Sequence, residues 1–339
     1  MKGETYQLIK KVTLKKLLNA FVVFATFYLS KWLKKPVHYG NPISLSIEPT
    51  TSCNLRCPEC PSGLRSFTRP TGMLQKEQFS RIIDELKATL MYLTFYFQGE
   101  PYLHPNFLAM VKEASDKGIY TSTSTNAHYL TDATAQQTVA SGLDKLIVSL
   151  DGITQEVYQQ YRVGGHINKV FEGVENVLRW KKKLNSSTPE VVFQFLVVKP
   201  NEHQIDDAKQ LAKDLKVDRI VFKTAQIYDY ENGSPLIPTK QEYSRYTEYA
   251  EGKYRFKGEL ERNCWRMWHS AVITWDGKVA PCCFDKDAKH VLGAIKNDYI
   301  GFLNIWHSQS YTNFRKSLLE GRENIDICKN CTEGINIFN

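Results

Sequence analysis

Three cysteines lie within eight residues in the first fifth of the chain and could together hold a metal cluster. Cys53, Cys57 and Cys60 stand in the spacing Cys-x3-Cys-x2-Cys. Three thiolates on one short loop can hold three irons of a [4Fe–4S] cube and leave the fourth iron open to a small chelating molecule. A tetrahedral zinc site would need a fourth ligand close by, and His38 is the only histidine nearby. The spacing therefore favours a cluster with one open iron, at which chemistry can occur.

The other cysteines lie in the last quarter of the chain, after about two hundred residues without any. A secreted disulfide framework is not bunched in this way, so the distribution indicates metal ligation in a reducing cytosol. A hairpin at Asp276-Gly277 would bring two of them together, and a terminal Cys-x2-Cys supplies two more. The four that could form one closed site are Cys264, Cys282, Cys328 and Cys331. A structural zinc is the alternative to a second cluster there. We interpret Cys283 as a packed bystander.

The chain resembles the radical S-adenosylmethionine (SAM) superfamily from about residue 43 to its end. The resemblance rests first on the three-cysteine loop, and it implies that the amino and carboxylate groups of SAM chelate the open iron. In that family an electron from the cluster cleaves SAM to a 5′-deoxyadenosyl radical, which abstracts hydrogen from the substrate. One position departs from the family pattern: Glu59 stands where an aromatic or large apolar residue usually lies near the adenine.

Further motifs of the same family follow the expected strands. Gln98-Gly99-Glu100 looks like the Gly-Gly-Glu motif that receives the SAM amino group, Thr125-Asn126 resembles the Thr-Asn-Gly turn, and Ser149-Leu150-Asp151-Gly152 is similar to Ser-Leu-Asp-Gly. Arg162 resembles an arginine that, with that serine, holds the SAM carboxylate, a task that suits a guanidinium fork. Each could singly be a turn residue or a surface ion pair, but in series they support one another. The SAM-binding residues implied by the resemblance are Gln98, Gly99, Glu100, Asn126, Ser149, Asp151 and Arg162.

The C-terminal cysteines resemble the shortened "twitch" version of the SPASM domain, which binds one auxiliary [4Fe–4S] cluster. The resemblance is carried by Cys-x12-Gly-x4-Cys, Leu292-Gly293, Ile305-Trp306, Arg315 and the terminal Cys-x2-Cys. It implies that all four irons of this cluster have a thiolate, so that no iron is vacant for substrate. Electron transfer is then the expected role, which favours a net two-electron oxidation or a radical coupling. The arrangement resembles radical SAM alcohol dehydrogenases of aminocyclitol antibiotic biosynthesis.

Alternating apolar runs and helical stretches predict the elements that position these loops. Strand-like runs occupy residues 43–48, 92–97, 120–125, 145–150, 191–198 and 219–223. Helix-like stretches occupy residues 76–86, 104–117, 132–140, 168–183 and 202–215. This alternation predicts an α/β fold, a partial (β/α)6 barrel with its chemistry at the carboxyl ends of the strands. We expect the barrel over residues 40–225, a linker or lid over 226–262 and a small α+β twitch domain over 263–339.

Residues 1–39 form a basic segment with an amphipathic helix expected at residues 13–33. Residues 1–35 carry eight lysines against one acid, Glu4, and so account for nearly all of the formal net charge of +8. The nearly neutral remainder does not support a nucleic-acid-binding surface. The central apolar run, residues 17–29, is shorter than the ~20 residues that cross a bilayer. We interpret the helix as lying in the plane of a membrane surface, with docking on the protein's own core or on a partner subunit as the alternative.

Together these patterns predict a radical SAM oxidoreductase that acts on an organic substrate. A small molecule, such as a sugar or a lipid-linked precursor, is the first expectation and a peptide the second, with flavodoxin or ferredoxin as reductant. The rival is a non-catalytic iron-sulfur scaffold or electron carrier. We expect a cytoplasmic protein, peripheral at the inner face of the membrane if the N-terminal helix binds lipid. As acid or base the sequence offers Lys223, Gln226 and Tyr228, each of which is as readily structural.

Overall fold

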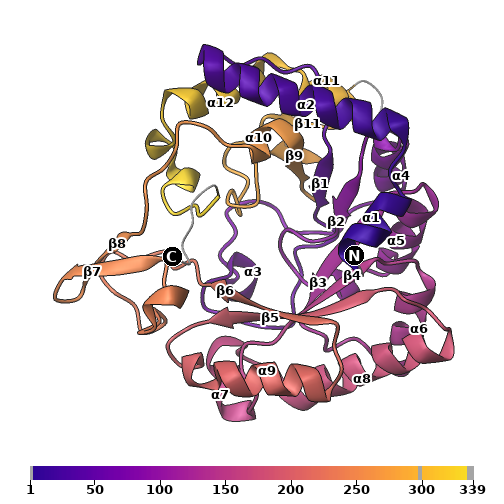
Figure 1. The fold of residues 1–339 in the computed structure, drawn as a ribbon, viewed down its shortest axis with the longest axis vertical. Coiled ribbons are helices and arrows are strands. Elements are labelled where there is room, and N and C mark those ends of the chain that lie inside the picture. The colour runs from indigo at the N-terminus through magenta and orange to yellow at the C-terminus, as the bar shows by residue number, and fades with distance from the viewer. Residues whose placement is uncertain (1–2, 297–299, 334–339) are drawn as a thin grey trace.

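The fold is built on one curved, mostly parallel sheet whose first six strands follow one another in space as they do in sequence. The computed structural model describes residues 3–296 and 300–333. The six strands are parallel and ordered β1 to β6, which confirms the predicted α/β barrel architecture (Figure 1). They are β1 (Ser44–Ile47), β2 (Tyr92–Thr94), β3 (Tyr120–Thr125), β4 (Lys145–Ser149), β5 (Glu190–Val197) and β6 (Arg219–Thr224). Each lies within its predicted range or extends one residue beyond it.

Helices between the strands cover the outer face of the sheet. They are α4 (Lys76–Leu86), α5 (Phe107–Asp116), α6 (Asp132–Ala140), α8 (Ile167–Lys183) and α9 (Ile205–Asp214), with the short α3 (Pro61–Leu64) and α7 (Gln155–Tyr161) on loops. The buried side chains of α4 recur at the spacing of one helix face and are Phe79, Ile82, Ile83 and Leu86. α5 begins three residues later than predicted because His104, which precedes Pro105, is extended. α9 begins later because residues 202–204 form a 3-10 turn.

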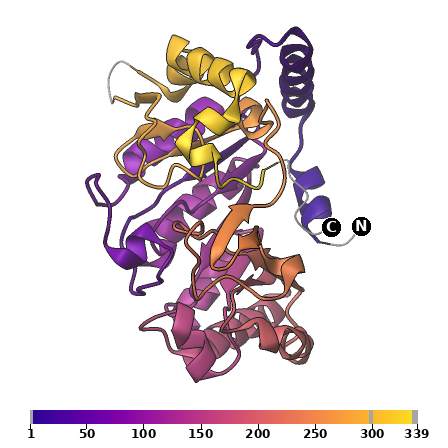
Figure 2. The same cartoon turned by 90° about the vertical axis from the view of Figure 1, so that its left-hand side faces the viewer.

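The C-terminal segment continues the same sheet across the free edge of β1. β9 (Ser270–Ile273) pairs in parallel with β1, and β10 (Lys278–Ala280) returns antiparallel beside β9. The hairpin predicted at Asp276-Gly277 is therefore confirmed, and Gly277 has the positive φ of 80° that its turn requires. β11 (Gly293–Ala294) ends the sheet, and α10 (Arg266–His269), α11 (Phe302–Trp306) and α12 (Gln309–Glu320) lie around these strands (Figure 2).

The segment after β6 carries a separate two-stranded hairpin. β7 (Tyr246–Ala250) and β8 (Lys253–Phe256) pair antiparallel and project from one side of the molecule (Figure 1). They lie within the stretch predicted as a linker or lid. The division of the chain into barrel, linker and small C-terminal domain stays a prediction.

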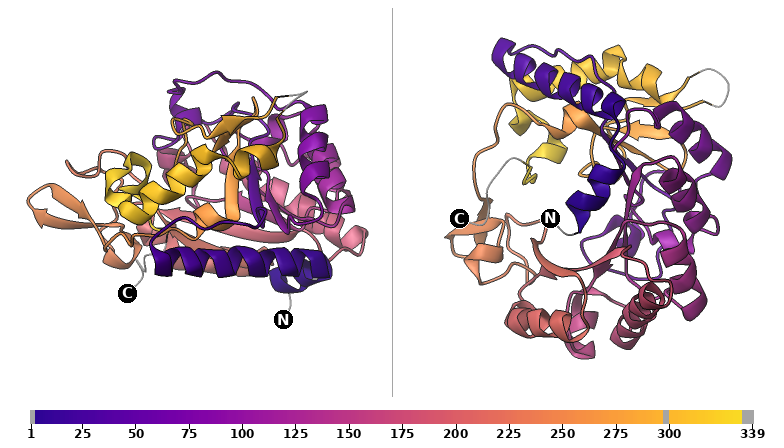
Figure 3. Two further views of the ribbon diagram at one scale, coloured as in Figure 1. Left: turned by 90° about the horizontal axis from the view of Figure 1, so that it is seen from above. Right: turned by 45° about the vertical axis from the view of Figure 1, so that its right-hand side comes forward.

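Two N-terminal helices lie on the outside of the fold, where α2 runs along one side (Figures 1 and 3). α1 (Glu4–Lys10) and α2 (Leu14–Leu33) meet at an angle of 113°. α2 coincides with the predicted helix, and Thr13 caps its first turn by accepting from the N–H of Lys16. Within the described ranges, no single helix is long and apolar enough to cross a membrane. α1 and α2 reach that length and apolar composition only when they are taken together as a bent pair.

Candidate active site

The first cysteine loop follows the carboxyl end of β1 and ends in α3. Pro61 occupies the first helical position, directly after Cys60. α3 packs so tightly on the loop that a Cβ at Gly63 would lie 2.5 Å from the backbone nitrogen and oxygen of Cys57. Only glycine fits this approach, so the loop and the helix that follows it form one compact unit.

Burial suppresses ionisation of two thiols in this loop, those of Cys53 and Cys57. Burial raises the pKa of Cys53 to about 11 and also raises that of Cys57. The Arg162 guanidinium opposes the second shift, because its Nη1 lies 3.6 Å from the Cys57 Sγ and favours a thiolate there. Iron binding must therefore release protons from these thiols, as metal binding to cysteine does in general.

The carboxyl ends of β2, β3 and β4 bring predicted SAM-binding residues to the cysteine loop. The Oε1 of Gln98 lies 3.7 Å from the Sγ of Cys60, and Arg162 contacts Cys57 as described. The Nδ2 of Asn126 donates a hydrogen bond of 2.8 Å to the side chain of Asn54, which lies in the same loop. Residues far apart in sequence thus meet at one edge of the sheet, as the parallel topology requires.

Glu100 is buried and ties the loop after β2 to the loop after β3. Its Oε1 accepts from the Thr125 hydroxyl at 2.8 Å, and its Oε2 accepts from the Asn126 N–H at 2.7 Å. Beside it, Gly99 has a φ of 77°, and a Cβ there would lie 2.2 Å from the carbonyl oxygen of Thr50. Glycine is required at this position for both reasons.

The ionisation of Glu100 predicts a pH dependence of SAM binding. Burial raises the pKa of Glu100 to about 7, against three hydrogen bonds that lower it. Because a carboxylate accepts from the SAM ammonium and a carboxylic acid does not, we expect SAM affinity to rise with pH between roughly pH 6 and pH 8. One pH unit below the pKa, affinity should be about tenfold weaker than its plateau. Calorimetric titrations of the reconstituted protein would measure this.

A Glu100→Gln variant serves as the comparison for that titration, because an amide of the same shape does not ionise. Its SAM affinity should be weak and independent of pH over the same range. A slope that survives in the variant would assign the ionisation to another group and remove Glu100 from the SAM amino site.

Asp151 and Ser149 occupy different surroundings at the end of β4. Asp151 is buried, and it accepts from the Nε of Arg162 at 2.5 Å and from the N–H of Leu196 at 2.8 Å. The side chain of Ser149 contacts the Ser124 hydroxyl at 3.5 Å. The structure therefore joins Arg162 to Asp151, whereas the predicted partnership of Arg162 with Ser149 at the SAM carboxylate stays a prediction.

The second cysteine group lies on loops around β9 and β10. Cys264 lies two residues before the start of α10, Cys282 follows β10, and Cys328 and Cys331 belong to the last described turns. Burial raises the pKa of Cys328 to about 12 and also raises that of Cys264. Cys283 packs against a small apolar cluster that includes Phe97; its predicted bystander role is otherwise untested.

Two arginines beside this second group, the buried Arg322 and the partly exposed Arg266, have buried donor atoms without acceptors. Arg322 donates through Nη1 to the carbonyl oxygens of Asn263 and Glu333, but its buried Nε and Nη2 have no acceptor among the described residues. The buried Nε of Arg266 also lacks one in the same part of the chain. Each unpaired buried donor costs ~1–3 kcal/mol. An anionic iron-sulfur cluster would supply the missing acceptors, so the surroundings of these cysteines fit the group that the sequence predicts.

A single metal ion finds no ready site in the described ranges, where no three histidine, cysteine, aspartate or glutamate side chains converge on one point. A cubane binds each thiolate at a separate iron. The features that indicate a cluster are therefore the unpaired hydrogen-bond donors of Arg322 and Arg266 near the cysteines.

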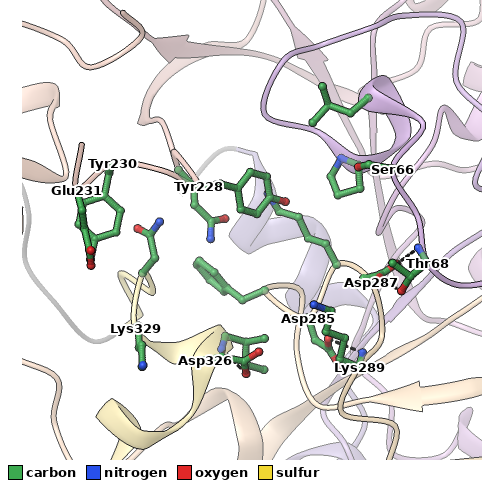
Figure 4. A pocket seen from close by; sticks show the side chains of 17 residues that line it. Ser66, Thr68, Tyr228, Tyr230, Glu231, Asp285, Asp287, Lys289, Asp326 and Lys329 are labelled. Atoms are coloured by element: carbon green, nitrogen blue, oxygen red, sulfur yellow. Dashed lines mark hydrogen bonds between the residues drawn. The ribbon is translucent and has the colours of Figure 1, made fainter. Parts of the chain in front are cut away.

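A cavity of about 570 Å³ is lined by residues that are sequence neighbours of cysteines in both groups, among them Pro61, next to Cys60, and Ile327, next to Cys328, although none of the described cysteines lines it (Figure 4). Its walls come from α3, the segment after β6, the loop after Cys283 and the turns around Cys328. Tyr228 and Gln226 line it, whereas Lys223 is exposed on β6 and does not. The Tyr228 N–H donates to the Oε2 of Glu59 at 3.0 Å, so the residue that departs from the family pattern anchors the cavity wall.

Sequence reasoning missed Lys286, whose Nζ lies 4.8 Å from the centroid of the Tyr228 ring in this cavity. Burial lowers the pKa of this lysine, while the nearby Cys60 and Glu59 raise it. It also missed Arg322 and Arg266. Position could have suggested two of the three, because Arg266 follows Cys264 by two residues and Lys286 follows Cys283 by three.

Comparison with curated proteins finds relatives along most of the chain. A tungsten-containing aldehyde ferredoxin oxidoreductase cofactor-modifying protein from Pyrococcus furiosus is 26% identical over 300 residues, which span 80% of this chain and 82% of that protein. An S-adenosyl-L-methionine-dependent 2-deoxy-scyllo-inosamine dehydrogenase from Niallia circulans is 26% identical over 85% of this chain and 91% of its own length. A PqqA peptide cyclase from Bradyrhizobium diazoefficiens is 26% identical over 72% of this chain and 67% of its own.

Solved structures share the fold. BtrN in complex with AdoMet and 2-DOIA aligns with a TM-score of 0.54 and 21% identity, over 88% of this chain and 95% of that one. Streptococcus suis SuiB bound to S-adenosylmethionine aligns with a TM-score of 0.63 and 14% identity, over 92% and 76% of the two chains. At these identities the likeness concerns the fold alone.

Two family models match the two halves of the site. The model of the radical SAM superfamily matches residues 47–215, which include the three-cysteine loop and its strand ends. The model of the SPASM iron-sulfur cluster-binding domain matches residues 264–332, which include the second cysteine group. These matches imply SAM, a [4Fe–4S] cluster and further iron-sulfur binding as the cofactors. The chain therefore belongs to the radical SAM superfamily of enzymes and carries a C-terminal SPASM domain.

Proposed function

We propose that this enzyme removes hydrogen from a small organic molecule in a net two-electron oxidation. The cavity lined by sequence neighbours of both cysteine groups is the observation that carries the proposal, because a substrate there would lie near the loops that carry both sets of cysteines. When bound, the loop cluster and SAM would supply the hydrogen-abstracting radical, and the second cluster would take up an electron from the substrate. The remaining tasks belong to the side chains of the chain itself.

Those tasks are cofactor orientation and substrate binding. Cys53, Cys57 and Cys60 would hold the first cluster. Glu100 would bind the SAM ammonium, and Gly99 beside it has no side chain to obstruct the cofactor. Nη2 of Arg162 makes no hydrogen bond within the described residues, so it can reach a carboxylate while Nε stays with Asp151. The cavity is lined by aromatic rings, carboxylates and lysines. Such a surface suits a polar molecule with several hydroxyl or amino groups.

The substrate class is inferred from the relatives. The Niallia circulans dehydrogenase is matched over nearly its whole length, which supports a polyhydroxylated small molecule. The Bradyrhizobium diazoefficiens relative is named a peptide cyclase, and it supports a peptide as the second candidate. The reductant we propose is a one-electron donor such as flavodoxin or ferredoxin.

Anaerobic reconstitution with iron and sulfide, followed by dithionite and SAM, would test the proposal. We expect release of 5′-deoxyadenosine, and an increase when the true substrate is present. Deuterated aminocyclitols and polyols should be compared with deuterated peptides, because only the substrate transfers deuterium to 5′-deoxyadenosine. Transfer from peptides alone would replace the first candidate by the second. Absence of 5′-deoxyadenosine under all conditions would favour the non-catalytic scaffold.

A Cys328→Ala variant should separate the two sites. It removes one predicted ligand of the second cluster, so iron should fall from about eight to about four per chain. Release of 5′-deoxyadenosine should persist, because the three-cysteine loop is untouched, whereas oxidised product should be lost. Iron analysis, electron paramagnetic resonance and product chromatography would measure these effects. Full product formation by a variant with half the iron would exclude an electron-accepting role for the second cluster.

A further inference from the structure

The helix α2 packs on the protein through its more polar side and exposes its apolar side to solvent. The stripe that faces the protein is largely polar, with Lys16, Thr26 and Ser30 buried beside Val23 and Phe27. The opposite stripe carries large apolar side chains that stand in solvent along the whole helix, among them Leu14, Leu18, Phe21, Phe24, Tyr28 and Trp32. Phe21 is 69% exposed and Trp32 is 79% exposed. A surface helix of a globular protein normally shows the reverse pattern, so this continuous apolar stripe marks an interaction surface.

Specific polar contacts fix this orientation. Lys16 Nζ donates to the carbonyl oxygen of Gly118 at 2.6 Å, and Ser30 Oγ donates to that of Val37 at 2.8 Å. The side chain of Asn19 pairs with the backbone of Asn41 in both directions. Turning the apolar stripe inward would leave these buried polar groups without partners, which is costly. The exposed stripe is therefore a built feature of the fold.

The same contacts prevent α1 and α2 from forming a straight span. At the bend between them, Lys11 Nζ pairs with the buried Asp144 at 2.5 Å, and it also donates to the carbonyl oxygen of Ile119. Glu4 on α1 pairs with Lys145 at 2.9 Å. Straightening α1 and α2 into one helix would break these ion pairs with the barrel. The two helices therefore do not form a straight membrane span, and α2 lies along the surface of the protein.

We propose that the outer face of α2 binds the surface of an anionic lipid bilayer. Lysines flank the apolar stripe, and Lys15, Lys34 and Lys35 form no ion pair within the described residues. Tyr28 and Trp32 lie at one end, where amphipathic rings suit the headgroup region. A second copy of this chain fits the face poorly, because a twofold contact would bring the two lysine-rich segments together and their charges would repel.

The barrel places this face away from the cysteine loop. α1 contacts Lys145 and Arg219, the first residues of β4 and β6, whereas the cysteine loop follows the carboxyl end of β1. In two views α2 lies on one side of the molecule and residues 50–75 on the other (Figures 2 and 3). Lipid contact through α2 would thus leave residues 50–75, part of which line the cavity, on the side of the molecule away from the bilayer.

Vesicle sedimentation of the full, reconstituted chain tests this inference independently of the proposed reaction. We expect the chain to sediment with vesicles of phosphatidylcholine and phosphatidylglycerol, and less with phosphatidylcholine alone. A Phe21→Glu/Trp32→Glu variant should partition roughly 100-fold more weakly, because two exposed aromatic side chains that would insert into the lipid are replaced by charged ones. A Lys34→Gln/Lys35→Gln variant should lose about fivefold per lysine on the anionic vesicles alone.

The control is Tyr249→Glu, which introduces one glutamate, against two in the Phe21→Glu/Trp32→Glu variant, at a tyrosine that is 62% exposed on β7. It should bind vesicles as the unchanged chain does, and circular dichroism and iron content should be alike in all variants. Failure of the unchanged chain to sediment, or equal binding by the Phe21→Glu/Trp32→Glu variant, would overturn the proposal. A dimer in sedimentation velocity that this variant dissociates would assign the face to a second copy instead.

Discussion

A Cys57→Ala variant is expected to lose all detectable SAM cleavage. Cys57 is the middle cysteine of the three-cysteine loop, where a Cβ at Gly63 would clash with its backbone and the Nη1 of Arg162 lies 3.6 Å from its Sγ. Without its thiolate, one iron of the first cluster has no protein ligand, and the cube that should activate SAM is not retained. Iron should fall from about eight to about four per chain, and 5′-deoxyadenosine should be absent after reduction with dithionite. Iron analysis and chromatography of the reaction mixture measure both effects.

The Cys57→Ala variant is best compared with Cys328→Ala, which removes a predicted cluster ligand from the second cysteine group. Cys328→Ala should reduce iron by the same amount while leaving 5′-deoxyadenosine release in place, because it acts on the C-terminal site. Cys283→Ala should retain the full iron content if that cysteine is a bystander. A Cys57→Ala protein that still cleaves SAM would disprove the assignment of the loop, whatever happens at the C-terminal cysteines.

The sequence was sufficient for the elements whose signals are local. The positions of β1 to β6 can be predicted from apolar runs in the sequence, and the three-cysteine loop can be predicted from the spacing of its cysteines. The pairing of β9 with β1 joins residues about 225 positions apart, and no periodicity encodes such a partner. The sequence therefore predicted the hairpin at Asp276-Gly277 and could not predict that the hairpin extends the barrel sheet.

The candidate site shows the same limit at the level of side chains. Gly99, Glu100 and Asn126 could be selected because each stands in a short motif directly after a strand. Arg322 could not, because its importance comes from buried donors that lack acceptors, a property of the folded surroundings. The helix α2 is similar: its composition predicted an amphipathic helix, but only packing reveals that the polar stripe faces the protein.

Arg162 has one predicted task, binding SAM, and one that the structure shows, which is pairing with the buried carboxylate of Asp151. Motif resemblance assigns it to the SAM carboxylate, whereas in the structure its Nε pairs with Asp151, a carboxylate that is 1% exposed. Burial raises the pKa of Asp151 and the neighbouring Arg162 lowers it. The arginine is thus required to keep an ionised group inside the fold, independently of any cofactor.

Replacing Arg162 with methionine should therefore destabilise the iron-free chain by about 3–5 kcal/mol, because Asp151 is left charged and buried without its partner. Urea unfolding under reducing conditions, followed by tryptophan fluorescence, measures this loss. It should shrink as pH falls, since protonation of Asp151 removes the unpaired charge and a carboxyl with a raised pKa in the folded state is stabilising at low pH.

The double variant Asp151→Asn/Arg162→Met decides whether the cost at Arg162 comes from Asp151. With the carboxylate gone, most of the stability should return, whereas SAM affinity should remain low because the guanidinium is still missing. Recovery of both properties would mean that Arg162 serves SAM binding only through the fold. A single variant as stable as the unchanged chain would mean that Asp151 has another partner, and the pairing at 2.5 Å would lose its structural role.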